Sequence, residues 1–299
     1  LVAMLADKDQ QGRFFGILDG GRGLVEALLA TFAVALFAYI LSQDAGSTKM
    51  ALQQVIYLYV GVLLIVSPLV YWLLDDREEG ADVTEEPAKS VFIDDLKDVL
   101  SRREIWLCAI CIVCGYQLFY ATYSFSAYLQ QNFSLTAVMV GYITVAKLWM
   151  RPIGGIAAGF IGDWLNPEKV LSILLILASL SLAMMAFVPA SSAALLMIVL
   201  VLLIGLLTYG VRGLYWATLG GCNVPNKIKG LAIGIISVIG YFPEVYLPLL
   251  SAPLIENYPG GLGYRIYYLI VATCGLLGAY AAYLLARPKV RAKHVLLDH

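Results

Sequence analysis

The sequence predicts an all-α polytopic membrane protein with eight transmembrane helices, on three observations. The chain of 299 residues is 61% hydrophobic, with a mean hydropathy of +0.81, and only 14% of its residues are charged, against about 25% in a soluble domain. Its apolar segments are long enough to cross a bilayer, which takes about 20 helical residues. Lys and Arg gather on one side of these segments, a pattern typical of cytoplasmic loops.

The eight apolar segments differ in their polar residues. The second, fifth and eighth are predicted from apolar length alone, whereas the first and seventh each carry a glutamate near mid-length. The third holds polar aromatic residues, the fourth two cations before a proline and two glycines, and the sixth an arginine after two glycines. Glycine and proline permit close packing and bends in membrane helices. The segments are 12–42, 51–74, 105–131, 136–164, 168–188, 192–219, 229–255 and 264–286.

The placement of Lys and Arg predicts the orientation. With the N-terminus inside, fourteen of these residues fall in cytoplasmic segments and two, Lys49 and Arg265, fall outside. This asymmetry satisfies the positive-inside rule for all eight segments, so we expect a multi-pass membrane protein with both termini cytoplasmic. Four further cations lie within the predicted helices: Arg22, Lys147, Arg151 and Arg212.

One long polar connection, residues 75–104, separates two predicted helices from the other six. Its first half is acidic and contains glycine and proline, while Val91, Ile93, Leu96 and Leu100 give its second half amphipathic spacing. This pattern predicts a flexible linker followed by an interfacial helix. The chain starts at Leu1 without a signal-peptide pattern, and we expect it to be the later part of a longer protein.

An internal repeat relates the first and seventh segments. An offset of 218 residues superposes Gly12 on Gly230 and Glu26 on Glu244, and it also pairs the glycines at 16 and 234. A charge at the centre of a membrane helix costs roughly 2.5 to 3.5 kcal/mol even on membrane-insertion scales, which give the lowest values. The repeated glutamate therefore indicates a partner or a function, such as contact with a transported solute.

The stretch GFIGDWLNPEK, at 159–169, resembles the signature loop of the major facilitator superfamily. Gly159 is followed four residues later by Asp163, although Trp164, Asn166 and Pro167 depart from the usual residues. The segments QQGRFFGILDGGRG and PNKIKGLAIGIISVIGYFPE resemble those of bacterial inner-membrane facilitators. The resemblance covers nearly all of the chain and implies a location in the bacterial inner (plasma) membrane.

The resemblance implies a twelve-helix fold in two six-helix halves, of which this chain holds helices five to twelve. Residues 1–74 would be the last two helices of the N-terminal half, and 75–104 the central cytoplasmic loop. Residues 105–286 would be the complete C-terminal half, and 287–299 a cytoplasmic tail. The repeat would then match helix five to helix eleven, which are equivalent positions about a pseudo-two-fold along the membrane normal. The full-length protein would be a monomer.

Three ionisable residues are predicted near mid-depth in the membrane: Glu26, Lys147 and Glu244. At 1.5 Å per residue they lie about 16 to 21 Å from the ends of their helices. Glu26 shares a helical face with Asp19 and Arg22, and Lys147 shares one with Arg151, so opposite charges can meet between helices.

Two interpretations of these charges stay open. In the first, Arg22 with Glu26, and Lys147 with a nearby carboxylate, are neutral pairs that fix helix register. In the second, at least one of Lys147, Glu26 and Glu244 faces a water-filled cavity and contacts solute or a coupled proton. Glu244 has no partner visible in the sequence, because the resemblance places it beside the absent second helix.

Further candidates come from the third and sixth helices. Tyr116, Gln117 and Tyr120 form a polar aromatic face suited to sugars or organic acids. Tyr116 and Tyr120 fit the interfacial aromatic belt equally well, and Tyr128 fits that belt best. Arg212 is close enough to the predicted cytoplasmic end to extend to the interface, or else it contacts solute.

The resemblance also assigns a gating role to the loop of Gly159 and Asp163. In the superfamily this aspartate lies against the cytoplasmic start of a helix in the other half, which here is the start of the first predicted helix. A carboxylate at a helix N-terminus is stabilised by about 0.3 to 2 kcal/mol. That is enough to bias an alternating-access equilibrium without freezing it.

The cysteines and histidines predict neither a metal site nor a catalytic pair. Cys108, Cys111 and Cys114 recur every three residues within an apolar helix, so we expect packing rather than ligation. The two histidines, at 294 and 299, lie in the charged tail. We therefore expect no cofactor, no metal and no enzymatic activity.

The sequence predicts a secondary active transporter that moves a small polar or anionic solute, such as a sugar, sugar acid or carboxylate, by alternating access. We expect symport with protons through Glu26 or Glu244, partners limited to solute, protons and lipid bilayer, and no nucleic acid. A phosphate-binding GxxxxGK[ST] motif is absent from the sequence, which argues against direct ATP drive. The alternative is a membrane sensor with the same fold that binds solute without transporting it.

Overall fold

The computed structural model describes residues 10–43, 47–73, 89–189, 194–222 and 224–287. These residues form α-helices and short 3-10 helices, in agreement with the predicted all-α class. The elements in chain order are α2 (Gln11–Gln43), α3 (Thr48–Leu73), α4 (Lys89–Ser101), α5 (Arg103–Ala121), η2 (Thr122–Ser124), α6 (Phe125–Phe133), α7 (Ala137–Leu165), α8 (Pro167–Phe187), α9 (Ala194–Leu214), η3 (Tyr215–Cys222), α10 (Asn226–Tyr241), α11 (Pro243–Asn257) and α12 (Leu262–Leu285).

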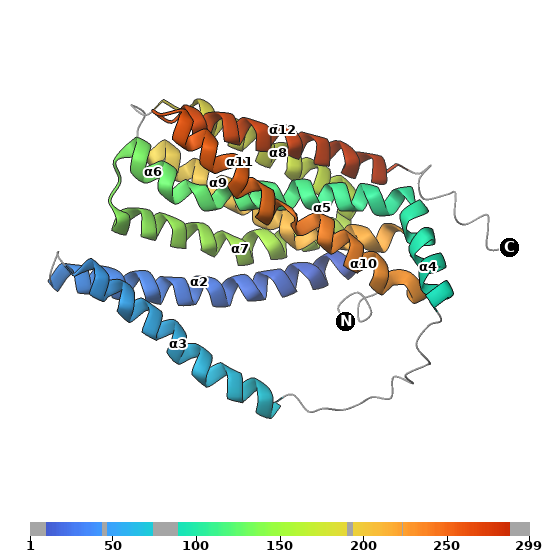
Figure 1. Cartoon of the computed structure of the whole chain (residues 1–299), viewed down its shortest axis with the longest axis horizontal. Helices are drawn as coiled ribbons and strands as arrows, with labels where there is room; N and C mark the ends of the chain where they lie inside the picture. Colours follow the sequence, from blue (N-terminus) through green and yellow to red (C-terminus); the bar gives the residue numbers. More distant parts are fainter. Residues whose placement is uncertain (1–9, 44–46, 74–88, 190–193, 223, 288–299) are drawn as a thin grey trace.

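The long helices form one elongated bundle with α3 set apart from it (Figure 1). The core lies where α5, α8, α9 and α12 pack together, and its fully buried side chains include Leu118, Leu175 and Tyr268. α2 packs along α7, and α3 leans away from α2 with almost all its side chains exposed. The start of α2, the end of α12 and the whole of α4 lie at one end of the bundle. We call this end the predicted cytoplasmic end.

Seven helical segments of the described residues are long and apolar enough to cross a membrane. They match the predicted first, second, third, fifth, sixth, seventh and eighth segments, with boundaries that differ by a few residues. The predicted fourth segment is a helix of 29 residues, α7, which Lys147, Arg151 and Asp163 make less apolar. Its crossing, and hence the count of eight, stays a prediction.

Three of the predicted helices are interrupted in the structure, one of them beside Gly240 and Pro243, where glycine and proline predicted a bend. A 3-10 turn at 122–124 separates α5 from α6, and the eight residues of η3 follow α9. The third interruption lies between Tyr241 and Pro243, where α10 gives way to α11. Proline at the start of a helix lacks only a hydrogen bond that the first turn cannot make, so Pro243 begins α11 without penalty. These breaks place the polar side chains of each segment on more than one face.

Glycines let α2 and α7 approach closely at the predicted cytoplasmic end. A Cβ atom on Gly16 would lie 2.6 Å from the carbonyl oxygen of Gly155, and one on Gly159 would overlap the carbonyl of Gly12. Real Cβ contacts are longer than this, so a larger residue would force the helices apart. The repeat partners Gly230 and Gly234 have no described atom within 4 Å of such a Cβ. The two halves of the repeat therefore differ in packing.

The turn between α7 and α8 is fixed by Asn166. This residue has φ of +129°, and its side-chain oxygen accepts hydrogen bonds from the backbone N–H groups of Glu168 and Lys169 at 3.1 and 3.2 Å. Asn is a preferred N-cap and tolerates positive φ better than most residues. The sharp turn places Asp163 at the end of α7, beside the start of α2.

The predicted interfacial helix is α4. Lys227 of α10 pairs with Asp95 at 3.0 Å, and the Trp106 indole N–H donates to the carbonyl of Leu100 at 2.8 Å. These contacts hold α4 at the predicted cytoplasmic end of α5 and α10 (Figure 1). The predicted flexible linker falls on 74–88, and the tail with both histidines on 288–299, so both lie outside the described residues.

Candidate functional site

A cavity of about 320 Å³ lies between α2 on one side and α9, η3 and α10 on the other. Its wall on α2 follows a helical stripe, because Gln11, Phe15, Asp19 and Arg22 are spaced by four or three residues. The opposite wall contributes cations and aromatic rings. The remaining lining residues are Leu18, Arg212, Tyr215, Trp216, Leu219, Gly220, Lys229, Ile233 and Tyr241.

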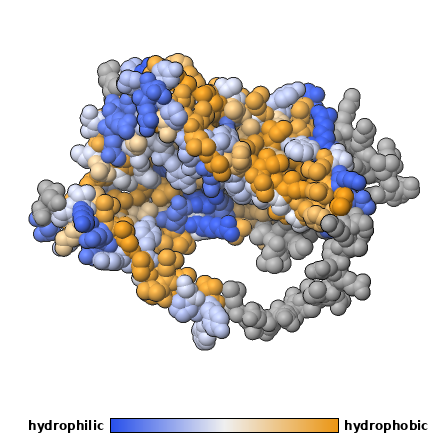
Figure 2. Space-filling view, in the orientation of Figure 1, coloured by the Kyte–Doolittle hydropathy of each residue, from blue (hydrophilic) through white to orange (hydrophobic). Residues whose placement is uncertain are grey.

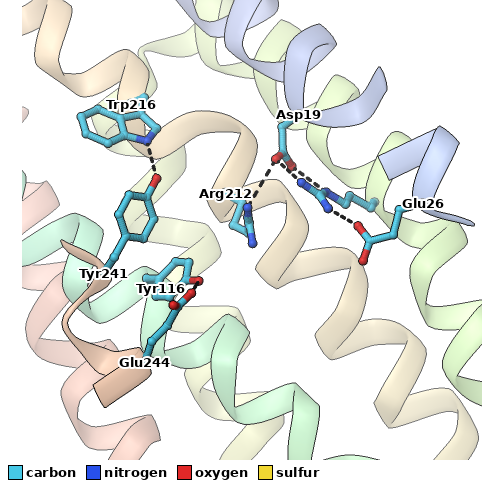
Figure 3. A network of polar contacts seen from close by, with 8 residues as sticks. Asp19, Glu26, Tyr116, Arg212, Trp216, Tyr241 and Glu244 are labelled. Atoms are coloured by element: carbon cyan, nitrogen blue, oxygen red, sulfur yellow. Dashed lines mark hydrogen bonds and ion pairs between the residues drawn. The ribbon is translucent and has the colours of Figure 1, made fainter. Parts of the chain in front are cut away.

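Arg151 of α7 joins two carboxylates of α2 beside this cavity (Figure 3). Its guanidinium donates to Asp19 through Nη2 at 2.7 Å and through Nε at 3.3 Å, and its Nη1 donates to Glu26. Arg151 is buried, Asp19 is 13% exposed and Glu26 is 44% exposed. Figure 2 shows hydrophilic surface over the middle of α2 and α7, where this group lies. The expected meeting of opposite charges across these helices is present.

The expected pairing of Glu26 with Arg22 is not the one the structure contains. Both residues are on α2, and their i, i+4 spacing allows contact, yet Glu26 pairs with Arg151 of α7. Arg22 instead lines the cavity. A buried arginine needs a carboxylate more than a surface arginine does, because an unpaired charge costs more away from water.

Arg212 of α9 turns into the cavity rather than toward the membrane interface. Its Nη2 lies 3.8 Å from Asp19, and its guanidinium lies over the Phe119 ring at 4.2 Å and the Tyr116 ring at 5.7 Å. The side chain is 18% exposed, and its Nε is buried without a hydrogen-bond partner among the described residues. The alternative that Arg212 extends to the interface is wrong for this conformation.

Glu244, the repeat partner of Glu26, lies at the first turn of α11 and accepts a hydrogen bond from the Tyr116 hydroxyl (Figure 3). The Tyr116 ring packs edge-on against Tyr241 at 4.8 Å, and the Tyr241 hydroxyl accepts from the Trp216 indole at 3.3 Å. Glu244 is exposed. The two related glutamates thus have unlike partners, a guanidinium for Glu26 and a phenol for Glu244.

Lys147 has a different setting from the one expected. It is 3% exposed, and its ammonium donates to the Thr122 hydroxyl at 2.9 Å and to the Thr122 carbonyl at 3.4 Å. The rings of Tyr123 and Phe125 lie 5.7 and 6.0 Å away. The carboxylate partner that the first interpretation gives Lys147 is therefore wrong: the buried Thr122 of the 3-10 turn and two aromatic rings take its place. Lys147 does not line the cavity.

The other candidates on the third predicted segment do not line the cavity. Gln117 is buried, donates to the Val271 carbonyl at 3.4 Å and accepts from the Tyr246 hydroxyl, so it faces α11 and α12 rather than the cavity. Tyr120 is half-buried and packs against Tyr123. Tyr128 was expected in the interfacial belt but is 3% exposed, because three neighbouring aromatic rings enclose it.

Asp163 lies at the start of α2, as the resemblance implies. Its carboxylate accepts from the backbone N–H groups of Gly12 at 2.7 Å and Arg13 at 2.9 Å, and from the Arg13 Nε at 3.1 Å. Free N–H groups and the helix dipole make a helix start a favourable place for a carboxylate. Gly159, one turn earlier, allows the close approach. The gating role of both residues stays a prediction.

The lining residues that were not sequence candidates include Gln11, Phe15, Gly220 and Lys229. The signal for the first two was the four-residue spacing that leads from Gln11 to Asp19. Gly220 touches the Gln11 side chain, since a Cβ there would overlap the Gln11 amide. Such a contact between α2 and η3 has no local signature in the sequence.

Residues 1–248 match the family described as the Major Facilitator Superfamily. The chain belongs to this family of membrane transporters. It is 28% identical over 92% of its length to inner membrane protein YqcE of Escherichia coli, and 26% identical over 96% to inner membrane protein YihN of the same organism. It spans 65% of the length of YqcE and 68% of that of YihN.

Proposed function

We propose that the protein is a secondary active transporter for a small anionic solute, such as a sugar acid or another carboxylate. The observation that carries the proposal is the cavity, where Arg22 and Arg212 line the same space as Asp19, the one acidic side chain among the described lining residues. Asp19 is itself paired with Arg151. A cavity with excess positive charge and low-dielectric walls concentrates anions. Its volume of about 320 Å³ lies at the lower end of ligand-sized pockets.

The walls of the cavity support a solute with a ring or an apolar body beside its charge. Tyr215, Trp216 and Tyr241 present aromatic surface together with a phenol and an indole N–H. Aromatic side chains of this kind combine apolar contact with a polar end. The same features favour sugar acids and ring carboxylates over small inorganic anions.

Alternating access is supported by the two-sided construction of the cavity. One wall is α2, which the proposal assigns to the N-terminal half, and the other is α9, η3 and α10 of the C-terminal half. Movement of one half against the other would open or close this space. The contact of Asp163 with the start of α2 would hold the predicted cytoplasmic end closed.

Proton coupling is proposed at Glu244 rather than at Glu26. Glu26 forms an ion pair with the buried guanidinium of Arg151. Glu244 accepts a hydrogen bond from a phenol, and no cation among the described residues forms an ion pair with it. Ionisable groups within membrane helices commonly mark proton paths, and Glu244 is the glutamate of the two that no ion pair within the described part of the chain holds.

The test is solute flux into proteoliposomes that contain the full-length protein. Radiolabelled D-glucuronate should accumulate when the outside is more acidic than the inside, and D-glucose should not. Glu244→Gln should abolish accumulation while glucuronate exchange across the membrane continues. Binding of glucuronate without any flux would refute transport and favour the sensor.

A further inference from the structure

Arg212 is incompletely paired among the described residues. Its 3.8 Å separation from Asp19 is much longer than the 2.7 Å between Asp19 and Arg151. Its Nε is buried without a hydrogen-bond partner among the described residues. A buried donor left without an acceptor costs about 1 to 3 kcal/mol, and more when the group is charged. Asp19 therefore neutralises Arg212 only weakly, because Arg151 already holds that carboxylate.

A carboxylate from solute would suit Arg212 better than Asp19 does. The planar guanidinium binds carboxylates with two parallel hydrogen bonds. The guanidinium carbon of Arg212 lies 4.2 Å from the centroid of the Phe119 ring, and Arg212 lines the cavity, so a carboxylate of the solute would reach it from the cavity. Trp216 and Tyr241 line the same cavity and offer ring surface to the body of the solute.

We propose that Asp19 stands in for the carboxylate of the solute, and that solute binding displaces it from Arg212. The inference rests on the proposed function, since it names the group of the solute that the cavity recognises and the side chain that competes for it. After displacement Asp19 stays on Arg151, which also keeps Glu26. Solute binding thereby removes the ion pair between Asp19 of α2 and Arg212 of α9, and it lowers the free-energy barrier to relative movement of these helices.

The experiment measures equilibrium binding of D-glucuronate to the full-length protein in nanodiscs, with D-glucose as the uncharged probe of similar shape. Asp19→Asn removes the competing charge but keeps the size of the side chain. We expect it to bind glucuronate about tenfold more tightly than the native protein, which corresponds to removal of a modest competing interaction. Arg212→Gln should lose glucuronate binding.

Glu26→Gln is the matched control. It removes the same charge from the same helix and from the same partner, Arg151, but Glu26 forms no ion pair with Arg212. Glucuronate affinity should change less than twofold in this variant. An equal gain in glucuronate affinity in both variants would mean that loss of any negative charge on α2 has the same effect, and it would overturn the inference. Unchanged or weaker binding in Asp19→Asn would overturn it as well, as would absence of glucuronate binding in both the native protein and Asp19→Asn.

The inference and the proposed transport fail in different measurements. Tighter binding in Asp19→Asn without any flux in the native protein would uphold the competition and refute transport. Flux of glucuronate with no effect of Asp19→Asn on binding would uphold transport and refute the competition between Asp19 and the solute. Chemical modification supplies a second measurement, because glucuronate should slow the reaction of Arg212 with phenylglyoxal. Equal reaction rates with and without glucuronate would count against the site.

Discussion

At the scale of single residues, Asp163 shows how one carboxylate can bias a conformational equilibrium. It accepts three hydrogen bonds from Gly12 and Arg13 and is almost wholly buried. A carboxylate at a helix start contributes about 0.3 to 2 kcal/mol. Asp163→Asn keeps the shape but removes the charge, so the predicted cytoplasmic end should open more often. Faster labelling of a cysteine placed at position 15, facing the cavity, would measure this, with Asp163→Glu as the charged control.

Lys147 and Thr122 give a second prediction at this scale. Thr122→Val removes the hydroxyl that accepts from the buried ammonium at 2.9 Å, which should cost about 1 to 3 kcal/mol or more. The apparent Tm should therefore fall. Adding Lys147→Met to Thr122→Val should restore most of the loss, because no buried charge is then left without its acceptor. Thr122→Ser retains the hydroxyl and serves as the control; additive effects of the two changes would contradict the pairing.

The residue scale is also where sequence reasoning reached its limit. The spacing on α2 placed Asp19, Arg22 and Glu26 on one helical face, and one of the two open interpretations paired Glu26 with Arg22. The structure pairs Glu26 with Arg151, which is 125 residues away. Likewise no pattern near Lys147 pointed to Thr122. Partner choice depends on which charges the tertiary structure buries, and helical periodicity carries no such information.

At the scale of elements, the long helices were predictable because apolar length dominates the choice between membrane and water. The interruptions at 122–124 and 215–222 were not predictable, whereas Gly240 and Pro243 indicated the bend that the structure has at 242. The first two place Thr122 beside Lys147 and Trp216 beside Tyr241. Such breaks become favourable only when the tertiary partners of the freed groups are in place.

The close packing of α2 on α7 yields a prediction for a pair of glycines on one helix. A Cβ at Gly16 would lie 2.6 Å from the Gly155 carbonyl, whereas a Cβ at Gly21 has no described atom within 4 Å. Both substitutions by alanine gain the same helix propensity. Gly16→Ala should therefore lower the apparent Tm, while Gly21→Ala should leave it unchanged or raise it slightly. Equal effects would show that the α2–α7 contact does not limit stability.

At the scale of the whole molecule, the exposed faces of α2 and α3 contrast with the packed core of α5, α8, α9 and α12. In Figure 2 hydrophobic surface covers much of α3, and hydrophilic surface lies over the middle of α2 and α7 and at the ends of the bundle. Charged side chains in membrane helices are expected against protein or water rather than lipid. The arrangement thus places α7, with its three charged residues, between α2 and α9.

The membrane crossing of α7 decides the topology of the molecule, since it separates seven crossings from eight. If α7 crosses, a reporter inserted after Ser134 and one inserted after Asn166 must lie on opposite sides of the membrane. The positive-inside rule places Asn166, next to Lys169, in the cytoplasm. A fluorescent protein that folds only in the cytoplasm should be active at Asn166, and alkaline phosphatase, active only outside, should be active at Ser134. The same reporter being active at both positions would mean that α7 does not cross the membrane. With seven crossings, the start of α2 and the end of α12 would lie on opposite sides.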